Sequence, residues 1–440
     1  MKRMTAFAVT ALLALSVAYA ADQPEQAIAQ AEPAAPATEV KPLDVKATGQ
    51  REWNYFKGQA ETTDKEMMTT LLNELDAWLI TYADEDTGDD ALLLKADLQT
   101  RLGDTKGAIV TFMRHVYEYP NSDLSFTLIS KLSRMIDKNI SSKLKPALEK
   151  VRQGSKKTTK AERMADFLIQ MSDGALDYFY EPMIQEFEAF FSKYPEYGRT
   201  DEVVLALGKF NASHAFYQSA VFQFNEIAAV YPDSPLKAQA KVLAASVYEN
   251  NLRQYDKAMA LFQSIVNDFP NSDAARASYV RIAQLAEKQS QYTLAVEAYR
   301  TLITKYPNTE DAYTAFINEA ELLRQKMEDP TGAVTVLAQA ADMFKGNADK
   351  SVKALTLAAS IAAKDKKDYE LQIKMLDRLV AEYPDAEPSP QALFDSASIS
   401  AEYLKDPDRA ALKYQQLIDR YPGNSLVKKA EKAIKKLSSN

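Results

Sequence analysis

Ten basic residues gather between positions 131 and 160 of a chain that is acidic overall. Only Asp137 and Glu149 oppose them, so ten positive against two negative charges leave this stretch at plus eight, in a chain whose net charge is -8. Such a positive field can attract an acidic partner, lipid head groups or an anionic polymer. The alternative interpretation is a solvated helix face. The ten residues are Lys131, Arg134, Lys138, Lys143, Lys145, Lys150, Arg152, Lys156, Lys157 and Lys160.

An acidic run from Asp84 to Asp90 resembles the start of a calcium-binding loop, but its spacing fails. The glycine that such a loop needs falls at Asp89, and its closing glutamate falls at Lys95. We therefore expect these carboxylates to lie at the start of a helix, where they favour its dipole.

The sequence contains no recognisable catalytic, metal-binding or cofactor-binding motif. It has no cysteine, and glycine accounts for only 12 of 440 residues, so phosphate-cradling glycine loops and cysteine-ligated metal sites are excluded. The two histidines, His115 and His214, have no Asp, Glu or Cys partner at ligand spacing, and we expect them to be packed. The sequence thus predicts no enzyme, no metal and no cofactor.

An aromatic residue followed by proline recurs along the chain at a nearly constant interval. Between Pro195 and Pro307 the successive spacings are 37, 38 and 37 residues, and Pro384 and Pro422 are 38 residues apart. The interval from Pro307 to Pro384 corresponds to two periods. A period of this length predicts an array of repeats rather than one globular core.

Each period reads as a hairpin of two helices. Residues 236–250 predict a first helix, and residues 255–269 predict a second one that ends because Phe269 precedes Pro270. Asp or Asn followed by Ser then offers caps for the next helix. A small residue stands twelve positions before the proline or its equivalent, with a large apolar residue four positions later. The small residues are Ala220, Ala258, Ala295, Ala333 and Ala410, and the large ones are Phe224, Phe262, Tyr299, Leu337 and Tyr414.

This pattern resembles the tetratricopeptide repeat, in particular the longer variant of bacterial envelope proteins with Tyr-Pro-Asp/Asn-Ser junctions. Relatives that it resembles are the Tol-Pal system coordinator and the lipoprotein of the outer-membrane protein assembly complex. The chain departs from both, because it shows no heptad coiled coil and no lipid-anchor cysteine, and has more repeats. The resemblance implies an all-α, right-handed superhelical solenoid of about ten hairpins with a C-terminal capping helix.

Five segments are predicted along the chain. Residues 1–20, with a basic start, a short apolar centre and an Ala-Tyr-Ala end, predict a secretory signal cleaved after Ala20. Residues 21–50 are rich in Pro and Ala and predict a disordered tether. Residues 51–160 predict degenerate hairpins, of which the third is the basic one, and residues 161–422 predict further hairpins. Residues 423–440 predict the lysine-rich capping helix.

The leading functional hypothesis is a non-enzymatic periplasmic scaffold for proteins or peptides of a cell-envelope complex. By analogy with the family, first-helix residues such as Gln284 and Glu287 would face the binding groove. The alternative is a binding protein for anionic envelope polymer or lipid head groups through the basic hairpin. Nucleic acid is not an expected partner, because the chain is acidic and carries an export signal, and no membrane span is expected once the signal is removed.

Overall fold

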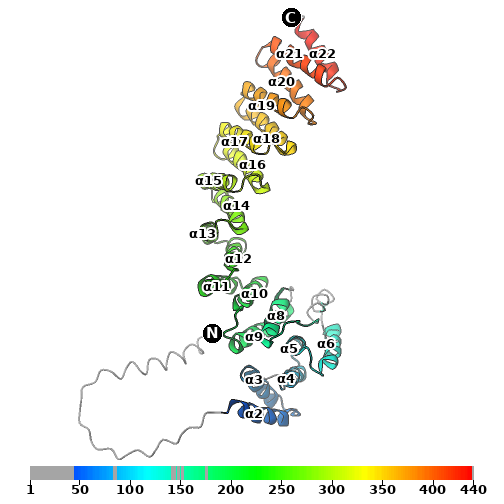
Figure 1. The fold of residues 1–440 in the computed structure, drawn as a ribbon, viewed down its shortest axis with the longest axis vertical. Coiled ribbons are helices and arrows are strands. Elements are labelled where there is room, and N and C mark those ends of the chain that lie inside the picture. The colour runs from blue at the N-terminus through cyan, green and yellow to red at the C-terminus, as the bar shows by residue number, and fades with distance from the viewer. Residues whose placement is uncertain are drawn as a thin grey trace, which may run out of the picture. The chain divides into compact units, whose positions relative to one another are not determined.

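The computed structural model describes residues 44–82, 87–139, 145, 149, 153–173 and 177–438, in which every regular element is a helix (Figure 1). Contacts divide the chain into two units, residues 1–55 and residues 56–440. The predicted signal at 1–20 and residues 21–43 of the predicted tether lie outside the described residues. Residues 45–50 of that tether instead begin helix α2 (Val45–Gln59), where an Asp44 carboxylate oxygen accepts from the amide of Ala47 at 3.0 Å.

The second unit contains two groups of helices, which we call the N-terminal block and the C-terminal array. The block comprises α3 (Lys65–Thr81), α4 (Gly88–Leu102), α5 (Thr105–Glu118), α6 (Ser125–Asn139), α8 (Lys160–Asp173), the 3-10 helix η1 (Asp177–Phe179) and α9 (Tyr180–Lys193). The array comprises α10 (Thr200–Ser213), α11 (Tyr217–Val230), α12 (Lys237–Asn250), α13 (Tyr255–Asp268), α14 (Asp273–Lys288), α15 (Tyr292–Lys305), α16 (Glu310–Gln325), α17 (Pro330–Met343), α18 (Ala348–Ile361), the π-helical turn η2 (Ala362–Lys366), α19 (Tyr369–Glu382), α20 (Ser389–Glu402), α21 (Pro407–Arg420) and α22 (Val427–Leu437).

The predicted start and stop signals act as expected in the middle of the array. Helix α13 ends at Asp268, directly before the Phe269-Pro270 junction. The hydroxyl oxygen of Ser272 accepts from the amide of Ala275 at 3.0 Å and caps α14, and Thr309 does the same for α16.

Two junction serines differ from the predicted capping role. Ser122 and Ser234 donate their hydroxyls to Asp89 and Asp201, at 2.7 and 2.5 Å, each one repeat earlier in the chain. The next helix begins three residues beyond each serine, and the serine oxygens accept from the amides of Leu124 and Leu236 just before those helices, at 3.2 and 3.1 Å. These serines therefore link successive first helices.

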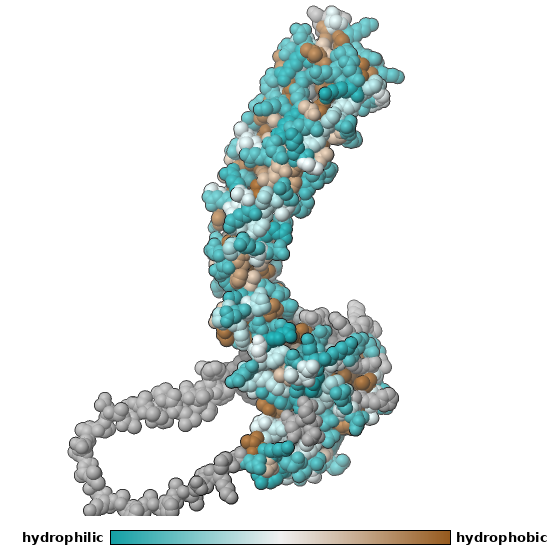
Figure 2. All heavy atoms as spheres, viewed as in Figure 1, coloured by the Kyte–Doolittle hydropathy of each residue, from teal (hydrophilic) through white to brown (hydrophobic). Residues whose placement is uncertain are grey.

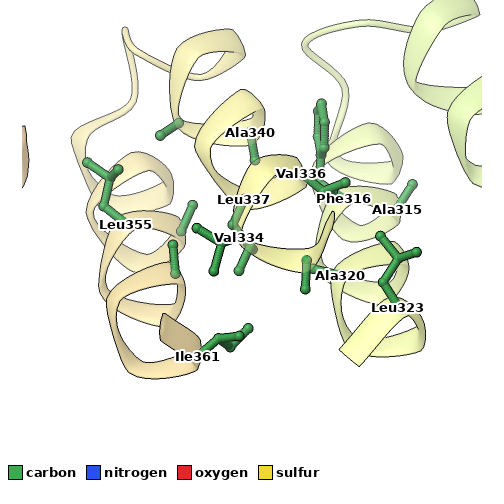
Figure 3. Packing of buried hydrophobic residues seen from close by; sticks show 14 of the residues in the cluster. Ala315, Phe316, Ala320, Leu323, Val334, Val336, Leu337, Ala340, Leu355 and Ile361 are labelled. Carbon is green, nitrogen blue, oxygen red and sulfur yellow. The ribbon is translucent and has the colours of Figure 1, made fainter. Parts of the chain in front are cut away.

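Small residues let successive helices of the array approach closely. The five alanines of the small-large pattern are all fully buried, and their large partners are at most 4% exposed. In Figure 3, Leu337 and Val334 of α17 point toward α18, whereas Val336 lies beside Phe316 of α16. Each helix from α10 to α22 packs on the next, which confirms the predicted all-α solenoid, and α22 closes it by packing on α21.

The junction tyrosines also connect neighbouring repeats. The Tyr306 hydroxyl donates to the carbonyl oxygen of Pro270 at 2.9 Å, and the Tyr421 hydroxyl donates to that of Pro384 at 2.7 Å. Where Phe344-Lys345 replaces the tyrosine-proline pair, the Tyr383 hydroxyl reaches the carbonyl of Lys345 at 3.1 Å. The recurring tyrosine thus bonds to the preceding junction.

The block follows a different packing order. Helix α9 packs against α3 and α5, which precede it by several elements, and α10 packs against α8. Aromatic residues at the start of α9 are packed: Phe179 is fully buried, and the ring of Tyr180 stacks on Phe210 and Phe216 with centroids 5.5 and 4.5 Å apart.

Candidate functional site

A polar cavity of about 510 Å³ lies between the first helices of two successive repeats, α14 and α16. Gln284, Glu287 and Lys288 of α14 are spaced by three and four residues, so they lie on one helix face. The same spacing brings four residues of α16 to the other wall. The lining comprises Gln284, Glu287, Lys288, Tyr299, Asn318, Glu321, Leu322, Gln325 and Lys326. We call this cavity the amide groove.

Tyr299 of α15 forms a buried base of the amide groove. Its ring is 2% exposed, and its hydroxyl donates to Glu287 Oε1 at 2.6 Å. Burial, followed by the neighbouring Glu287 carboxylate, raises the pKa of Tyr299, so its proton stays on the hydroxyl at neutral pH. This bond fixes the orientation of Glu287.

Further hydrogen bonds orient the walls. Arg281 donates to Gln284 Oε1 at 2.7 Å and also pairs with Glu249 of α12. On the other wall, Arg324 donates to Glu321 at 2.8 Å and lies 3.5 Å from Asp365. The amide groove is therefore a pre-arranged polar surface that offers both donors and acceptors.

Both residues that the sequence singled out for a groove, Gln284 and Glu287, line this cavity. Sequence reasoning missed the opposite wall, formed by Asn318, Glu321 and Gln325. The repeat period could have predicted this wall, because Glu321 stands one period of 37 residues after Gln284. That these residues bind a ligand stays a prediction.

The ten basic residues do not form one described site. Lys143, Lys150 and Arg152 lie outside the described residues. Lys145 is described, and its backbone is helical. Two others have contacts within the chain: Lys131 lies 3.6 Å from Asp97, and Lys160 donates to the hydroxyl of Tyr119 at 2.9 Å. The remaining four, Arg134, Lys138, Lys156 and Lys157, are exposed.

A cluster of buried, paired charges lies inside the N-terminal block and was not predicted from the sequence. Glu186 of α9 lies 3.2 Å from Lys95 and accepts from Arg114 at 2.7 Å, and Arg114 also donates to Glu118 at 2.7 Å. Lys193 lies 3.6 Å from Glu118 and donates to the carbonyl of Leu79 at 2.9 Å. We call these five residues, Lys95, Arg114, Glu118, Glu186 and Lys193, the buried ion network.

Electrostatics in this network favour the ionised carboxylates. Burial alone would raise the pKa of Glu118, but Arg114 and Lys193 outweigh it and lower that pKa to about 2. The pKa of Glu186 is lowered in the same way by Lys95 and Arg114. Burial lowers the pKa of Lys193 to about 8. Because both carboxylates already have cationic partners inside the protein, we interpret the network as structural.

The other residues considered for chemistry are also accounted for by packing. His115 is fully buried, as expected, and burial lowers its pKa. Asp89 and Asp90 lie in the first turn of α4, as predicted, whereas Asp84 and Asp86 lie outside the described residues. In the described part of the chain, no group of three or more His, Asp or Glu side chains could hold a metal ion. None of the described helices is long and apolar enough to cross a membrane.

Exposed apolar side chains do not define a second obvious surface. On the face drawn in Figure 2, hydrophobic residues form separate patches among hydrophilic ones. The most exposed large ones, Leu412, Phe222 and Tyr55, belong to different helices. The amide groove is thus the site that the geometry supports best.

A family model described as tetratricopeptide repeat matches four stretches of the chain, residues 90–122, 239–272, 277–309 and 391–424. They correspond to the hairpins α4–α5, α12–α13, α14–α15 and α20–α21. The chain carries tetratricopeptide repeats. Such repeats typically mediate interactions between proteins, and the amide groove lies directly between the third matched hairpin and the next one.

Several solved structures are similar to this chain in fold. A tetratricopeptide repeat protein from Parabacteroides merdae is 16% identical and covers 63% of this chain and 100% of its own, with a TM-score of 0.31. The C-terminal part of a TPR repeat-containing protein from Cytophaga hutchinsonii is 13% identical. The match covers 61% of this chain and 98% of that one, with a TM-score of 0.34. YrrB, a TPR protein described as having an unusual peptide-binding site, is 14% identical. The match covers 48% of this chain and 97% of that one, with a TM-score of 0.28. No curated protein matches the chain.

Proposed function

We propose that this chain is a non-enzymatic periplasmic scaffold that binds peptide segments of cell-envelope proteins in the amide groove. The observation that carries the proposal is the cavity of about 510 Å³ between α14 and α16, because two successive first helices supply its walls. A groove between repeats can follow an extended segment of a partner, whereas one hairpin alone would present a single face.

The side chains of the amide groove suit a peptide backbone. Gln284, Asn318 and Gln325 each carry both a donor and an acceptor, which is the complement of a peptide unit. Acidic Glu287 and Glu321 stand beside basic Lys288 and Lys326, so neither sign of charge dominates the lining. We therefore expect affinity to change little with salt, since screening weakens mainly exposed, unbalanced charges.

The periplasmic part of the proposal rests on the sequence. Lys2 and Arg3 precede an apolar stretch and an Ala-Tyr-Ala site, as in secretory signals, and the absence of cysteine leaves no lipid-attachment residue. The junctions resemble those of envelope proteins of this repeat class. Cell fractionation with tagged protein tests this part, and a purely cytoplasmic pool would contradict it.

Site-specific photo-crosslinking in cells tests the groove. A photoreactive residue at Gln284, Asn318 or Gln325 should capture a defined set of envelope proteins, while the same residue at exposed Gln263 of α13 should not. Replacing two of the three positions with Ala should abolish capture at the third. Identical crosslinks from Gln263 and from the groove would contradict the proposal.

A second candidate, binding of anionic envelope polymer by the basic hairpin, is favoured by the exposure of Arg134, Lys138, Lys156 and Lys157. Changing Arg134, Lys138, Lys156 and Lys157 to Glu should then release the protein from purified cell wall, and raised salt should do the same. Wall binding that survives both treatments would exclude this candidate.

A further inference from the structure

A second cavity, of about 710 Å³, lies on a different face of α16 from the amide groove, between the second helices α15 and α17. Phe316 and Glu319 line it, whereas Asn318 and Gln325 line the amide groove. At 100° per residue these two pairs point to different sides of the helix. The apolar walls of this second cavity are formed by Ile303, Phe316, Val336 and Met343. Val336 and Phe316 lie side by side in Figure 3.

Glu319 at the base of this cavity is a buried charge in an otherwise apolar position. Its side chain is 1% exposed, and Ile282 occupies the equivalent place 37 residues earlier. One carboxylate oxygen, Oε1, accepts from Arg300 Nε at 2.7 Å. In the described part of the chain, no other hydrogen bond to this carboxylate is found. A carboxylate can accept several hydrogen bonds, so Glu319 has capacity for further donors besides Arg300.

Helix α17 leaves the space over Glu319 open. Gly332 stands where Leu294 stands one repeat earlier, so no side chain extends from this position of α17. Asp329 is needed to begin α17, since its Oδ1 accepts from the amide of Gly332 at 2.8 Å. Because Gly332 has no side chain, the cavity is wider at this position.

We propose that this second cavity, which we call the Glu319 cavity, binds a lysine or arginine side chain with an adjacent apolar residue from a partner protein. The charged lining residues are the carboxylates of Glu319 and Asp329 and the guanidinium of Arg300, so one negative charge is left over. A cationic side chain balances that charge and gives Glu319 further donors. The apolar walls pack against the methylene stem and the neighbouring residue.

The side chain of Arg300 does not block this binding. It is 61% exposed, so its guanidinium extends toward solvent while its Nε bonds to the buried carboxylate. Thr304 and Thr335 on the rim donate their hydroxyls to carbonyls of their own helices, at 2.8 and 2.9 Å, which leaves Gln339 as the rim amide for the partner backbone.

Selection from a library of random phage-displayed peptides on the immobilised full chain tests the proposal. Recovered peptides should include a class with Lys or Arg beside an apolar residue, and their affinity is then measured by calorimetry against four variants. Glu319→Gln keeps the shape of the side chain and removes its charge. Thr335→Trp fills the cavity from the exposed rim, Thr335→Ala is its matched control, and Gln284→Ala alters only the amide groove.

Glu319→Gln and Thr335→Trp should each weaken these peptides by at least about tenfold, whereas Thr335→Ala and Gln284→Ala should leave affinity unchanged. Circular dichroism verifies that all four variants are folded. Recovery of no basic-apolar class overturns the proposal, as do peptides indifferent to Thr335→Trp. Acidic peptides that lose binding in a fifth variant, Arg300→Gln, whose folding is verified in the same way, also overturn it. Loss of binding only in Gln284→Ala would instead support the amide groove, so the two proposals fail separately.

Discussion

The N-terminal block and the C-terminal array use opposite means to hold helices together. In the array, each interface joins sequence neighbours through fully buried alanines such as Ala258 and Ala295, and partly exposed ion pairs such as Arg276 with Asp311 and Arg409 with Glu370 connect adjacent repeats. In the block, Lys95 and Glu186 are 91 residues apart, and Lys193 reaches the carbonyl of Leu79 across 114 residues. Buried charge there joins segments that an array would keep apart.

This difference shows what a repeat can specify. A small residue at a fixed place lets any hairpin stack on the next, so an array can grow by repetition. Nothing in that rule brings α9 back to α3 and α5. Complementary buried charges do so selectively, because an unpaired charge in the interior is costly and a wrong partner leaves it unpaired.

Arg114→Met is expected to have the largest effect, because it leaves Glu118 and Glu186 buried without their shared partner. The block should lose about 3–5 kcal/mol of stability toward unfolding. Both tryptophans of the chain, Trp53 and Trp78, precede the array, so fluorescence of a Trp53→Phe background reports unfolding of the block through buried Trp78.

The matched control is Arg409→Met, which breaks the exposed pair of Arg409 with Glu370 at 2.8 Å in the array. Its cost should be below about 1 kcal/mol. Equal losses in the two variants would erase the distinction between the regions.

The second-largest effect should be a loss of stability of the block in acid. The folded-state pKa of Glu118 lies at about 2, below the ordinary value of 4.5, so its contribution is present above pH 4.5 and is lost as the pH falls toward 2. The loss should be on the order of 3 kcal/mol. Urea unfolding followed by Trp78 fluorescence at several pH values measures it. Arg114→Met should flatten the dependence, and an unchanged slope in that variant would refute the assignment.

Tyr306→Phe should cost the array about 1 kcal/mol, because the carbonyl of Pro270 loses its donor from the next repeat. Hydrogen exchange measured by mass spectrometry should show faster exchange around the junction at 270. Tyr292→Phe removes only an exposed 3.4 Å contact to Ser290 and serves as the control. Equal exchange in both variants would show that the junction bond contributes nothing.

The turns between paired helices should give the smallest effects, of opposite sign in the two regions. Gly103 of the block has a φ of 86°, whereas Ser290 of the array has a φ of 60° without being glycine. Gly103→Ala should destabilise by about 1 kcal/mol, since no atom lies within 4 Å of the added Cβ and only backbone strain acts. Ser290→Gly should stabilise by less than about 1 kcal/mol. Thermal unfolding of both variants measures this, and two shifts of the same sign would contradict it.

Much of the array could be predicted from the sequence because its signals are local. The end of α13 before Pro270 and the cap at Ser272 depend on residues within a few positions of each other. The buried alanines follow from the same period. Gln284 and Glu287 could be placed on a common face by helical spacing, although their role is still a prediction.

The candidate sites were less predictable, because single residues within the repeats decide them. Glu319 in place of an apolar core residue, and Gly332 in place of a larger one, look like ordinary variation in a polar, degenerate repeat. Only the tertiary structure, in which residues of α15, α16 and α17 line one cavity, shows that the two changes lie at the same place.

The sequence by itself determined the helical hairpins, their boundaries and the small-large packing between neighbours, because propensity, proline and capping act over short distances. Only the tertiary structure decided that α9 packs on α3 and α5, and which charges become buried partners there. Contacts between residues 72 to 114 positions apart leave no period in the sequence. Their stability depends on burial, and burial exists only once the distant helices have met.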